Sequence, residues 1–282
     1  MSQMMDGKHV ASLLREKIKV ETEQCFTRTG KRPFLAVVIV GDDPASLSYV
    51  RSKEKFAAEV GFNAKTFALP ISTSEDALVA QIQKLNEDDQ VSGILVQLPL
   101  PAHINAQTII NTIDVKKDVD GFHPEQVGGL SLGLETLHPC TPAGIMALLA
   151  HYDLSLAGKH AVIIGRSNIV GKPIAQLLLN HDATVTVTHS KTKHLAELAR
   201  TADLLVVAIG KPLFLTADLV KPGAIVIDVG INRNAEGKLV GDVDFESVRE
   251  KAAYLTPVPG GIGPMTIAML LSNTLKAFKR SL

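Results

Sequence analysis

A chain of 282 residues is long enough for two modest domains, because a single core rarely grows past roughly 250 residues. Hydrophobic residues make up 46% of the chain, charged residues 21%, and the formal net charge is zero, so the composition does not favour binding to nucleic acid or to an anionic membrane. The chain's start lacks the apolar segment of a signal peptide, and its apolar runs are far shorter than the roughly 20 residues that span a bilayer. We therefore expect a cytoplasmic protein without membrane segments, with Cys25 and Cys140 as free thiols.

The first half of the chain alternates predicted helices and strands. Helices are expected at residues 8–25, 45–60 and 75–85, and strands at 34–40, 64–68 and 93–98. Ser72 and Glu75 have the spacing of a capping box at the start of the third helix. Apolar strands separated by helices indicate a parallel sheet covered by helices.

The second half repeats this alternation. Helices are expected at residues 142–152, 169–180 and 194–200, and strands at 160–165, 183–189, 203–210 and 224–230. A last, strongly apolar helix is expected to begin at Pro264 and to pack back on the first domain. The predicted fold is thus α/β with two domains: an amino-terminal α/β catalytic domain of residues 1–139 plus 264–282, and a Rossmann-like domain of residues 140–263.

A glycine-rich turn follows the predicted strand at 160–165. Gly165 and Gly171 bracket the opening of a helix, where backbone amides favour a phosphate, and Ser167 stands where a dinucleotide fold has its second glycine. A P-loop is excluded, because the glycine spacing is one residue too long and Lys172 is followed by Pro173 rather than Ser or Thr. The alternative is a turn that merely lets helix pack on strand.

The end of the next predicted strand indicates which dinucleotide binds. NAD-specific folds place an acidic residue about 20 residues past the turn, but residues 189–193 contain no acid. Ser190 can donate a hydrogen bond to a 2′-phosphate, and Arg166 or the nearby lysines can supply charge-assisted ones. NADP is therefore favoured over NAD, although Lys191 and Lys193 also suit a solvated helix start.

Tyr49 and Lys53 lie four residues apart on one predicted helical stripe that continues to Phe56 and Val60. In short-chain dehydrogenases such a pair follows the glycine-rich turn, so its place before the turn indicates a separate substrate-binding domain. Lys53 either extends to water or is partly buried with a lowered pKa suited to acid/base work.

Two further segments carry polar groups where an α/β sheet binds ligands. Gln97 falls at the carboxyl end of the strand at 93–98. Asp118 and Asp120 share a loop; one is expected to form a turn with Gly121 and the other to meet a ligand. No third ligand has suitable spacing, so no metal site is predicted.

Together these segments resemble the bifunctional methylenetetrahydrofolate dehydrogenase/methenyltetrahydrofolate cyclohydrolase family. The resemblance runs from about Gly41 to Leu270 and is carried, in chain order, by SLSYVRSKEK, GILVQLPLP, KDVDGFHP, PCTPAGIMALL, GRSNIVGKP and PVPGGIGPMT. It implies a homodimer that acts on tetrahydrofolate derivatives in one-carbon metabolism, with NADP as cofactor.

The resemblance also implies roles for individual residues. Those expected around the pterin, in a cleft between the domains, are Tyr49, Lys53, Gln97, Leu98, Asp120, Gly261 and Pro264. Those expected to contact NADP are Gly165, Arg166, Ser167, Ser190 and Ile231. The expected catalytic residues are the four polar side chains around the pterin: Tyr49, Lys53, Gln97 and Asp120.

The expected chemistry divides between these side chains. Tyr49 and Asp120 would orient the pterin for hydride transfer, whereas Lys53 would assist attack of water in the hydrolysis, with Gln97 orienting that water. Alternatives are a relative that uses NAD or has lost one activity, a shikimate-dehydrogenase-like NADP oxidoreductase, and a non-catalytic dinucleotide-sensing module.

Overall fold

The computed structural model describes residues 2–282, which form two compact units. Unit 1 comprises the residues up to Ala11 with Thr141–Thr266, and unit 2 comprises Ser12–Cys140 with Ile267–Leu282. These units differ from the predicted domains at the amino terminus, because strand β1 (Gln3–Met4) pairs with β11 (Tyr254–Leu255) of unit 1. Met1, the first residue of the predicted catalytic domain, lies outside the described residues.

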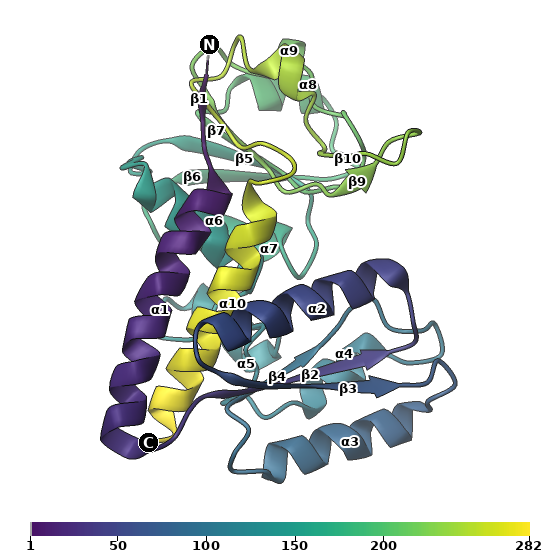
Figure 1. Cartoon of the computed structure of the whole chain (residues 1–282). Coiled ribbons are helices and arrows are strands. Elements are labelled where there is room, and N and C mark those ends of the chain that lie inside the picture. The colour runs from purple at the N-terminus through teal and green to yellow at the C-terminus, as the bar shows by residue number, and fades with distance from the viewer. Residues whose placement is uncertain (1) are drawn as a thin grey trace. The chain divides into compact units, whose positions relative to one another are not determined.

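Unit 2 contains a parallel three-stranded sheet in the order β3-β2-β4. Its strands are β2 (Phe34–Val40), β3 (Asn63–Leu69) and β4 (Gly93–Val96), and the helices α2 (Pro44–Glu59) and α3 (Glu75–Glu87) follow β2 and β3 in the chain. Figure 1 shows the sheet between these two helices. The arrangement confirms the helix-covered parallel sheet that the apolar strands predicted.

The alternating side chains of β2 explain why both faces of this sheet are covered. Val37 shares one core with Val50 of α2, while Val38 shares another with Leu78 and Ile82 of α3. Since successive strand residues point to opposite faces, the continuous run FLAVVIV requires a helix on each side. Ser74, and not the predicted Ser72, caps α3: its hydroxyl accepts the Ala77 N–H at 3.2 Å.

Helices α1 (Gly7–Thr29) and α10 (Ile262–Arg280) complete the core of unit 2. Ile18 of α1 and Leu271 of α10 lie buried in the same cluster as Val37. The final helix therefore packs on the first sheet as predicted, and it begins two residues before Pro264. Two further helices, α4 (Ala106–Thr112) and α5 (Pro124–Ser131), were not predicted from the sequence, because they are short and interrupted by polar residues.

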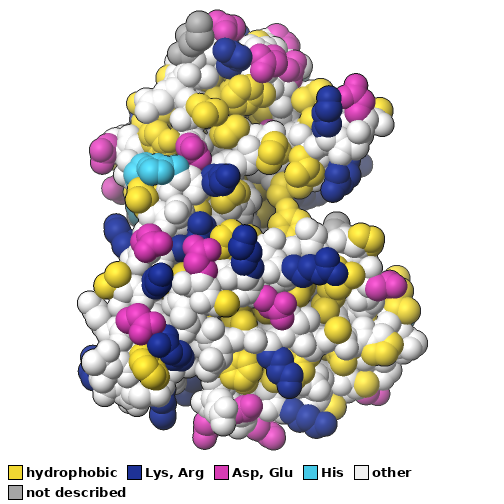
Figure 2. Space-filling view, in the orientation of Figure 1, with side chains coloured by type: hydrophobic (Ala, Val, Ile, Leu, Met, Phe, Trp, Pro, Cys, Tyr) yellow, Lys and Arg dark blue, Asp and Glu magenta, His cyan; other side chains and the backbone are white. Residues whose placement is uncertain are grey.

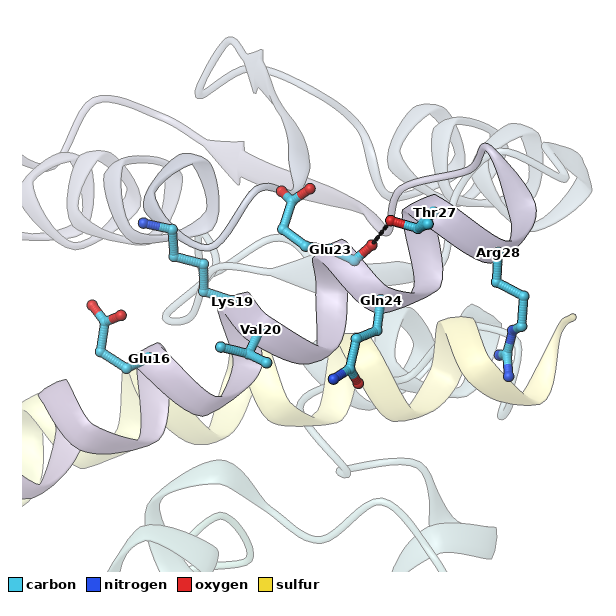
Figure 3. Close-up of a pocket in the computed structure, with 7 residues that line it drawn as sticks. All are labelled: Glu16, Lys19, Val20, Glu23, Gln24, Thr27 and Arg28. Carbon is cyan, nitrogen blue, oxygen red and sulfur yellow. Dashed lines mark hydrogen bonds between the residues drawn. The ribbon is translucent and has the colours of Figure 1, made fainter.

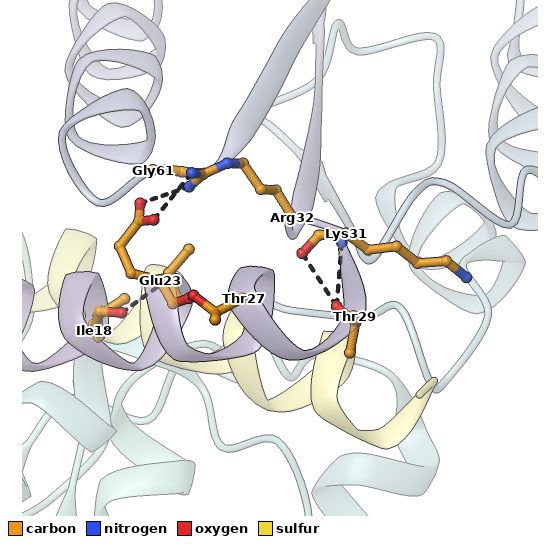
Figure 4. Close-up of polar contacts among 8 residues, drawn as sticks. Ile18, Glu23, Thr27, Thr29, Lys31, Arg32 and Gly61 are labelled. Atoms are coloured by element: carbon orange, nitrogen blue, oxygen red, sulfur yellow. Dashed lines mark hydrogen bonds and ion pairs between the residues drawn. The ribbon is translucent and has the colours of Figure 1, made fainter.

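The Arg32 side chain connects α1 with the turn before β3 in unit 2 (Figure 4). Arg32 Nη1 and Nη2 donate to the two carboxylate oxygens of Glu23 at 2.7 and 3.1 Å, and Nη1 also donates to Gly61 O at 3.1 Å. The guanidinium lies 4.1 Å from the centroid of the Phe26 ring. One planar side chain thus joins α1 to the turn that precedes β3.

Unit 1 contains a parallel six-stranded sheet in the order β1-β11-β8-β7-β5-β6. Its longer strands are β5 (His160–Ile164), β6 (Thr184–Thr188), β7 (Leu204–Val207) and β8 (Ile225–Asp228), with β6 at one edge. The chain passes from β5 outward to β6 and then returns to β7 on the other side of β5. This reversal creates a topological switch point, and ligands of such sheets bind beyond the carboxyl ends of the strands there.

Short helices and a hairpin surround this sheet. The helices are α6 (Cys140–His151), α7 (Gly171–Leu179), α8 (Leu195–Arg200), α9 (Phe245–Val248) and the 3₁₀ turn Ala217–Leu219, and the hairpin pairs β9 (Asn232–Arg233) with β10 (Leu239–Val240). Helix α7 begins at Gly171, two residues later than predicted. No helix within residues 2–282 combines the length and apolar character needed to cross a membrane. Acidic and basic side chains are interspersed over the face shown in Figure 2.

Candidate functional site

A lysine and a glutamine from separate elements meet at the carboxyl end of the unit 2 sheet. Lys53 lies on α2, and Gln97 directly follows β4. Lys53 Nζ donates to Gln97 Oε1 at 2.9 Å, and Gln97 Nε2 donates to the backbone oxygen of Leu98 at 2.7 Å. The second bond fixes the amide orientation, so that its oxygen faces the lysine.

Burial and an acidic neighbour act in opposite directions on this lysine. Desolvation lowers the pKa of Lys53, and the nearby Asp120 carboxylate opposes this by raising it. Burial likewise raises the pKa of Asp120, and the Lys53 charge lowers it. Lys53, Gln97 and Asp120 therefore form one partly buried, electrostatically coupled cluster, in which the lysine loses its proton more readily than a surface lysine.

The two aspartates of the 118–120 loop have different surroundings. Asp118 is buried and accepts the Gly121 N–H at 3.1 Å and the His123 N–H at 2.7 Å, which confirms that one aspartate makes the turn with Gly121. Burial raises the pKa of Asp118 to about 7, although these N–H donors lower it. Asp118 thus stabilises the loop through backbone hydrogen bonds, whereas Asp120 interacts electrostatically with Lys53.

A buried asparagine on α10 holds this loop from the other side. Asn273 Nδ2 donates to Val119 O and to His138 O, each at 2.9 Å, and lies 3.7 Å from Cys140 Sγ. Burial raises the pKa of the Cys140 thiol well above its ordinary value, and the Asp120 carboxylate adds to this. Sequence reasoning missed Asn273, because an isolated polar residue in an apolar helix does not reveal its partners.

Tyr49 lies on α2 one helical turn before Lys53, on the same side of the helix. Its side chain is 38% exposed, and partial burial raises the pKa of its phenol. Tyr49 therefore offers an aromatic surface that a planar ligand can cover.

The glycine-rich turn of unit 1 lies at the switch point of its sheet. A Cβ on Gly165 would lie 2.3 Å from Ala208 O, and one on Gly171 would lie 2.3 Å from Gly165 O, so both positions require glycine. Ser167 Oγ accepts the N–H groups of Val170 and Gly171 at 3.1 and 3.2 Å. The serine thus occupies two of the amides that we expected to be free, and its hydroxyl hydrogen remains available to donate.

Strand register brings Arg166 and Ser190 to the same edge. Ile164 of β5 pairs with Thr188 of β6. Arg166 lies two residues after Ile164 in the sequence, and Ser190 lies two residues after Thr188. Arg166 and Ser190 are both exposed. The pair offers a cation and a hydroxyl beside the glycine turn, and this arrangement fits the phosphates of a dinucleotide.

The remaining predicted residues also belong to unit 1. Ile231 follows β8 and is 47% exposed, and a Cβ on Gly263 would lie 3.8 Å from its Cδ1. Gly261 directly precedes α10, and Pro264 lies in its first turn. These residues thus belong to a different unit from the Lys53 cluster.

Within residues 2–282, neither the hollow on α1 nor a cluster of metal-ligating side chains offers a second candidate site. Figure 3 shows a hollow on α1 whose lining comes from residues 16–28 of that single helix and carries charges of both signs around Val20. No group of three or more His, Cys, Asp or Glu side chains in the described chain is arranged to hold a metal ion.

Residues 5–120 match the catalytic domain of tetrahydrofolate dehydrogenase/cyclohydrolase, and residues 139–282 match its NAD(P)-binding domain. The chain belongs to the tetrahydrofolate dehydrogenase/cyclohydrolase family.

Individual relatives match along the whole chain. The bifunctional protein FolD of Campylobacter hominis is 58% identical, covering 99% of this chain and 98% of its own. The crystal structure of the FolD enzyme from Campylobacter jejuni has a TM-score of 0.98 and 53% identity, covering 100% of both chains. The Trypanosoma brucei enzyme, complexed with NADP cofactor and inhibitor, has a TM-score of 0.96 and 40% identity, covering 99% of this chain and 98% of its own. A shikimate 5-dehydrogenase from Thermus thermophilus shares the fold alone, with a TM-score of 0.56 and 18% identity over 88% of this chain and 98% of its own.

Asn273→Leu tests whether α10 supports the 118–120 loop. The change removes the donor from one buried and one part-buried carbonyl oxygen, so we expect a loss of about 1–3 kcal/mol in the free energy of unfolding. Thr274→Val is the matched control, because Thr274 is also buried but its hydroxyl donates to Leu270 O in its own helix, at 2.8 Å. Urea unfolding measures both variants, and equal losses would contradict the supporting role.

Proposed function

We propose that this protein oxidises 5,10-methylene-tetrahydrofolate to the 5,10-methenyl form with NADP and then hydrolyses that product to 10-formyl-tetrahydrofolate. The observation that carries the proposal is the partly buried Lys53 held 2.9 Å from Gln97 beside Asp120, in a chain of the dehydrogenase/cyclohydrolase family. Unit 2 is proposed to bind the folate and unit 1 the cofactor.

The oxidation requires orientation more than proton transfer. A hydride leaves the carbon that bridges the two folate nitrogens, and a nitrogen lone pair forms the C=N⁺ bond of the methenyl product. NADP, when bound, supplies the hydride acceptor. We assign Tyr49 to cover the pterin ring and Asp120 to accept hydrogen bonds from its amino and ring N–H groups.

The hydrolysis requires proton transfer. Water forms a bond to the methenyl carbon and loses a proton, and the C–N5 bond then breaks as N5 gains one. We assign Lys53 to this proton transfer, because desolvation lowers its pKa and a cationic substrate would lower it further. Gln97 is assigned to orient the water, since its amide is already fixed by Leu98 O.

For the cofactor, we assign the glycine turn to the pyrophosphate and Arg166 with Ser190 to the 2′-phosphate of NADP. Support comes from Gly165 and Gly171, where an added Cβ would clash with backbone atoms, and from the pairing of Ile164 with Thr188, two residues before Arg166 and Ser190. The NADP complex of the Trypanosoma brucei relative adds weight to this choice.

The other readings have weaker support. The likeness to shikimate 5-dehydrogenase lies at 18% identity and concerns the fold. A non-catalytic dinucleotide sensor would have no use for the coupled Lys53 cluster. We also propose a cytoplasmic homodimer, which rests on the family resemblance and which sedimentation of the purified protein would test.

Lys53→Met should separate the two activities. Cyclohydrolase activity should fall by at least about 100-fold, which is the usual contribution of a positioned acid or base, while part of the NADP reduction persists. Lys55→Met on the exposed side of α2 is the control and should change neither rate. Both rates are followed by the absorbance of the methenyl product and of NADPH; unchanged hydrolysis in Lys53→Met would refute the assignment.

The pH profile of hydrolysis gives an independent test. If the neutral amine of Lys53 accepts the proton, the enzymatic rate rises with pH until Lys53 has lost its proton. Since desolvation lowers the pKa of Lys53, the midpoint should lie below that of an ordinary lysine. The measurement is the hydrolysis rate against pH after subtraction of the uncatalysed rate, and Lys53→Met should lack this rise. A midpoint at or above the ordinary lysine value would contradict the mechanism.

Arg166→Ala tests the choice of dinucleotide. Loss of a charge-assisted hydrogen bond should raise the Michaelis constant for NADP about tenfold or more and leave that for NAD nearly unchanged. Arg200→Ala is a suitable control, because Arg200 ends α8 and pairs with Asp218 instead of following a strand. Equal increases for NADP and NAD would rule out a 2′-phosphate contact.

A further inference from the structure

Unit 1 contains a carboxylate that sequence reasoning did not single out. Asp242 is fully buried and accepts four hydrogen bonds. Its Oδ2 accepts the N–H groups of Ile209 at 2.7 Å and Gly210 at 3.0 Å, and its Oδ1 accepts the Lys211 N–H at 2.8 Å and Asn232 Nδ2 at 2.9 Å. Three successive backbone amides and one side chain thus converge on a single anion.

These donors lie at the ligand-binding edge of the sheet. Residues 209–211 follow β7, and Asn232 follows β8 with the exposed Ile231 just before it. Ala208, at the start of the first loop, touches the glycine turn, because a Cβ on Gly165 would lie 2.3 Å from its oxygen. Asp242 therefore joins two of the loops that border the switch point.

A second carboxylate holds Asp242 in place. Asp228 Oδ1 accepts the N–H of Asp242, and its Oδ2 accepts that of Val243, each at 2.9 Å. Asp228 Oδ1 also accepts the Gly230 N–H at 2.9 Å. Burial raises the pKa of Asp228 to about 7, although these N–H donors lower it. The end of β8 is thereby bonded to the segment that carries Asp242.

The proposed direction of NADP determines which half of the cofactor these loops meet. In the assignment proposed above, the turn after β5 would hold the pyrophosphate, and Ser190 after β6 would hold the 2′-phosphate. The two halves of a dinucleotide extend to opposite sides of the pyrophosphate, across the switch point. The nicotinamide half must then extend toward the loops that follow β7 and β8, which Asp242 joins.

We infer that Asp242 is a positioning residue for the nicotinamide half of NADP: its carboxylate holds residues 209–211 and the Ile231–Asn232 segment together as one wall of the cofactor site. The inference rests on the proposed function. Asp242 is assigned no contact with the substrate, and its loss should affect oxidation while sparing hydrolysis, because Lys53 and Gln97, the residues assigned to hydrolysis, lie in unit 2.

Asp242→Asn tests this with little change in volume. The amide keeps one acceptor oxygen and directs an NH₂ group at backbone donors, so the loops must separate. We expect the Michaelis constant for NADP to rise about tenfold, which corresponds to the loss of one such interaction, and hydrolysis to stay within about twofold of the parent protein. Asp203→Asn is the matched control: Asp203 also accepts a backbone N–H, from His160 at 2.9 Å, but at the opposite end of β7.

A second, smaller change tests the same inference if Asp242→Asn does not fold. Asn232→Ala removes only the 2.9 Å bond to Oδ1 and should raise the Michaelis constant for NADP in the same direction by a smaller factor. NADPH binding, followed by fluorescence, should weaken in both variants and not in Asp203→Asn. This binding assay needs no folate, so it tests the inference even if the parent protein fails to turn over folates and the proposed function falls.

Two results would overturn the inference. One is an unchanged affinity for NADPH in folded Asp242→Asn, or in Asn232→Ala where the first variant does not fold. The other is a parallel loss of oxidation and hydrolysis in folded Asp242→Asn, because a role in general stability alone predicts that both fall together.

Discussion

Desolvation of one ammonium group is the constraint on which the unit proposed to bind folate depends. Lys53 loses part of its hydration on α2, and the cost is limited by Gln97 at 2.9 Å and by the Asp120 carboxylate. These partners come from the end of a strand and from a loop. The sheet, α2 and α10 must therefore all be in place before the lysine has the surroundings that alter its proton affinity.

The two units use the same edge of a parallel sheet for different tasks. In unit 2 the carboxyl end of β4 presents Gln97 to a titratable lysine, whereas in unit 1 the ends of β5 and β6 present a turn, a cation and a hydroxyl. Parallel strands gather their carboxyl ends at one edge, where backbone groups are no longer paired within the sheet. Each unit fills that edge with side chains suited to either proton transfer or phosphate binding.

Much of this could be predicted from sequence, because local signals were strong. Continuous apolar runs identified the central strands, and residue spacing placed Lys53 on the stripe of Tyr49. The signals failed where partners lie far apart in the chain: β1 is two residues long and is defined only by its pairing with β11. Asn273 and Asp242 are likewise single polar residues, and their partners become apparent only once helices and loops are folded together.

The chain passes between the units three times, after Ala11, after Cys140 and after Thr266. No single cut can therefore yield two complete fragments: a break near Cys140 leaves β1 on one piece and its partner β11 on the other. A gene encoding such a chain cannot lose one half by simple truncation and keep the other half intact. Because each unit is built from two separate segments of the chain, neither unit can be encoded by one uninterrupted part of the gene, even though each has a sheet and a core of its own.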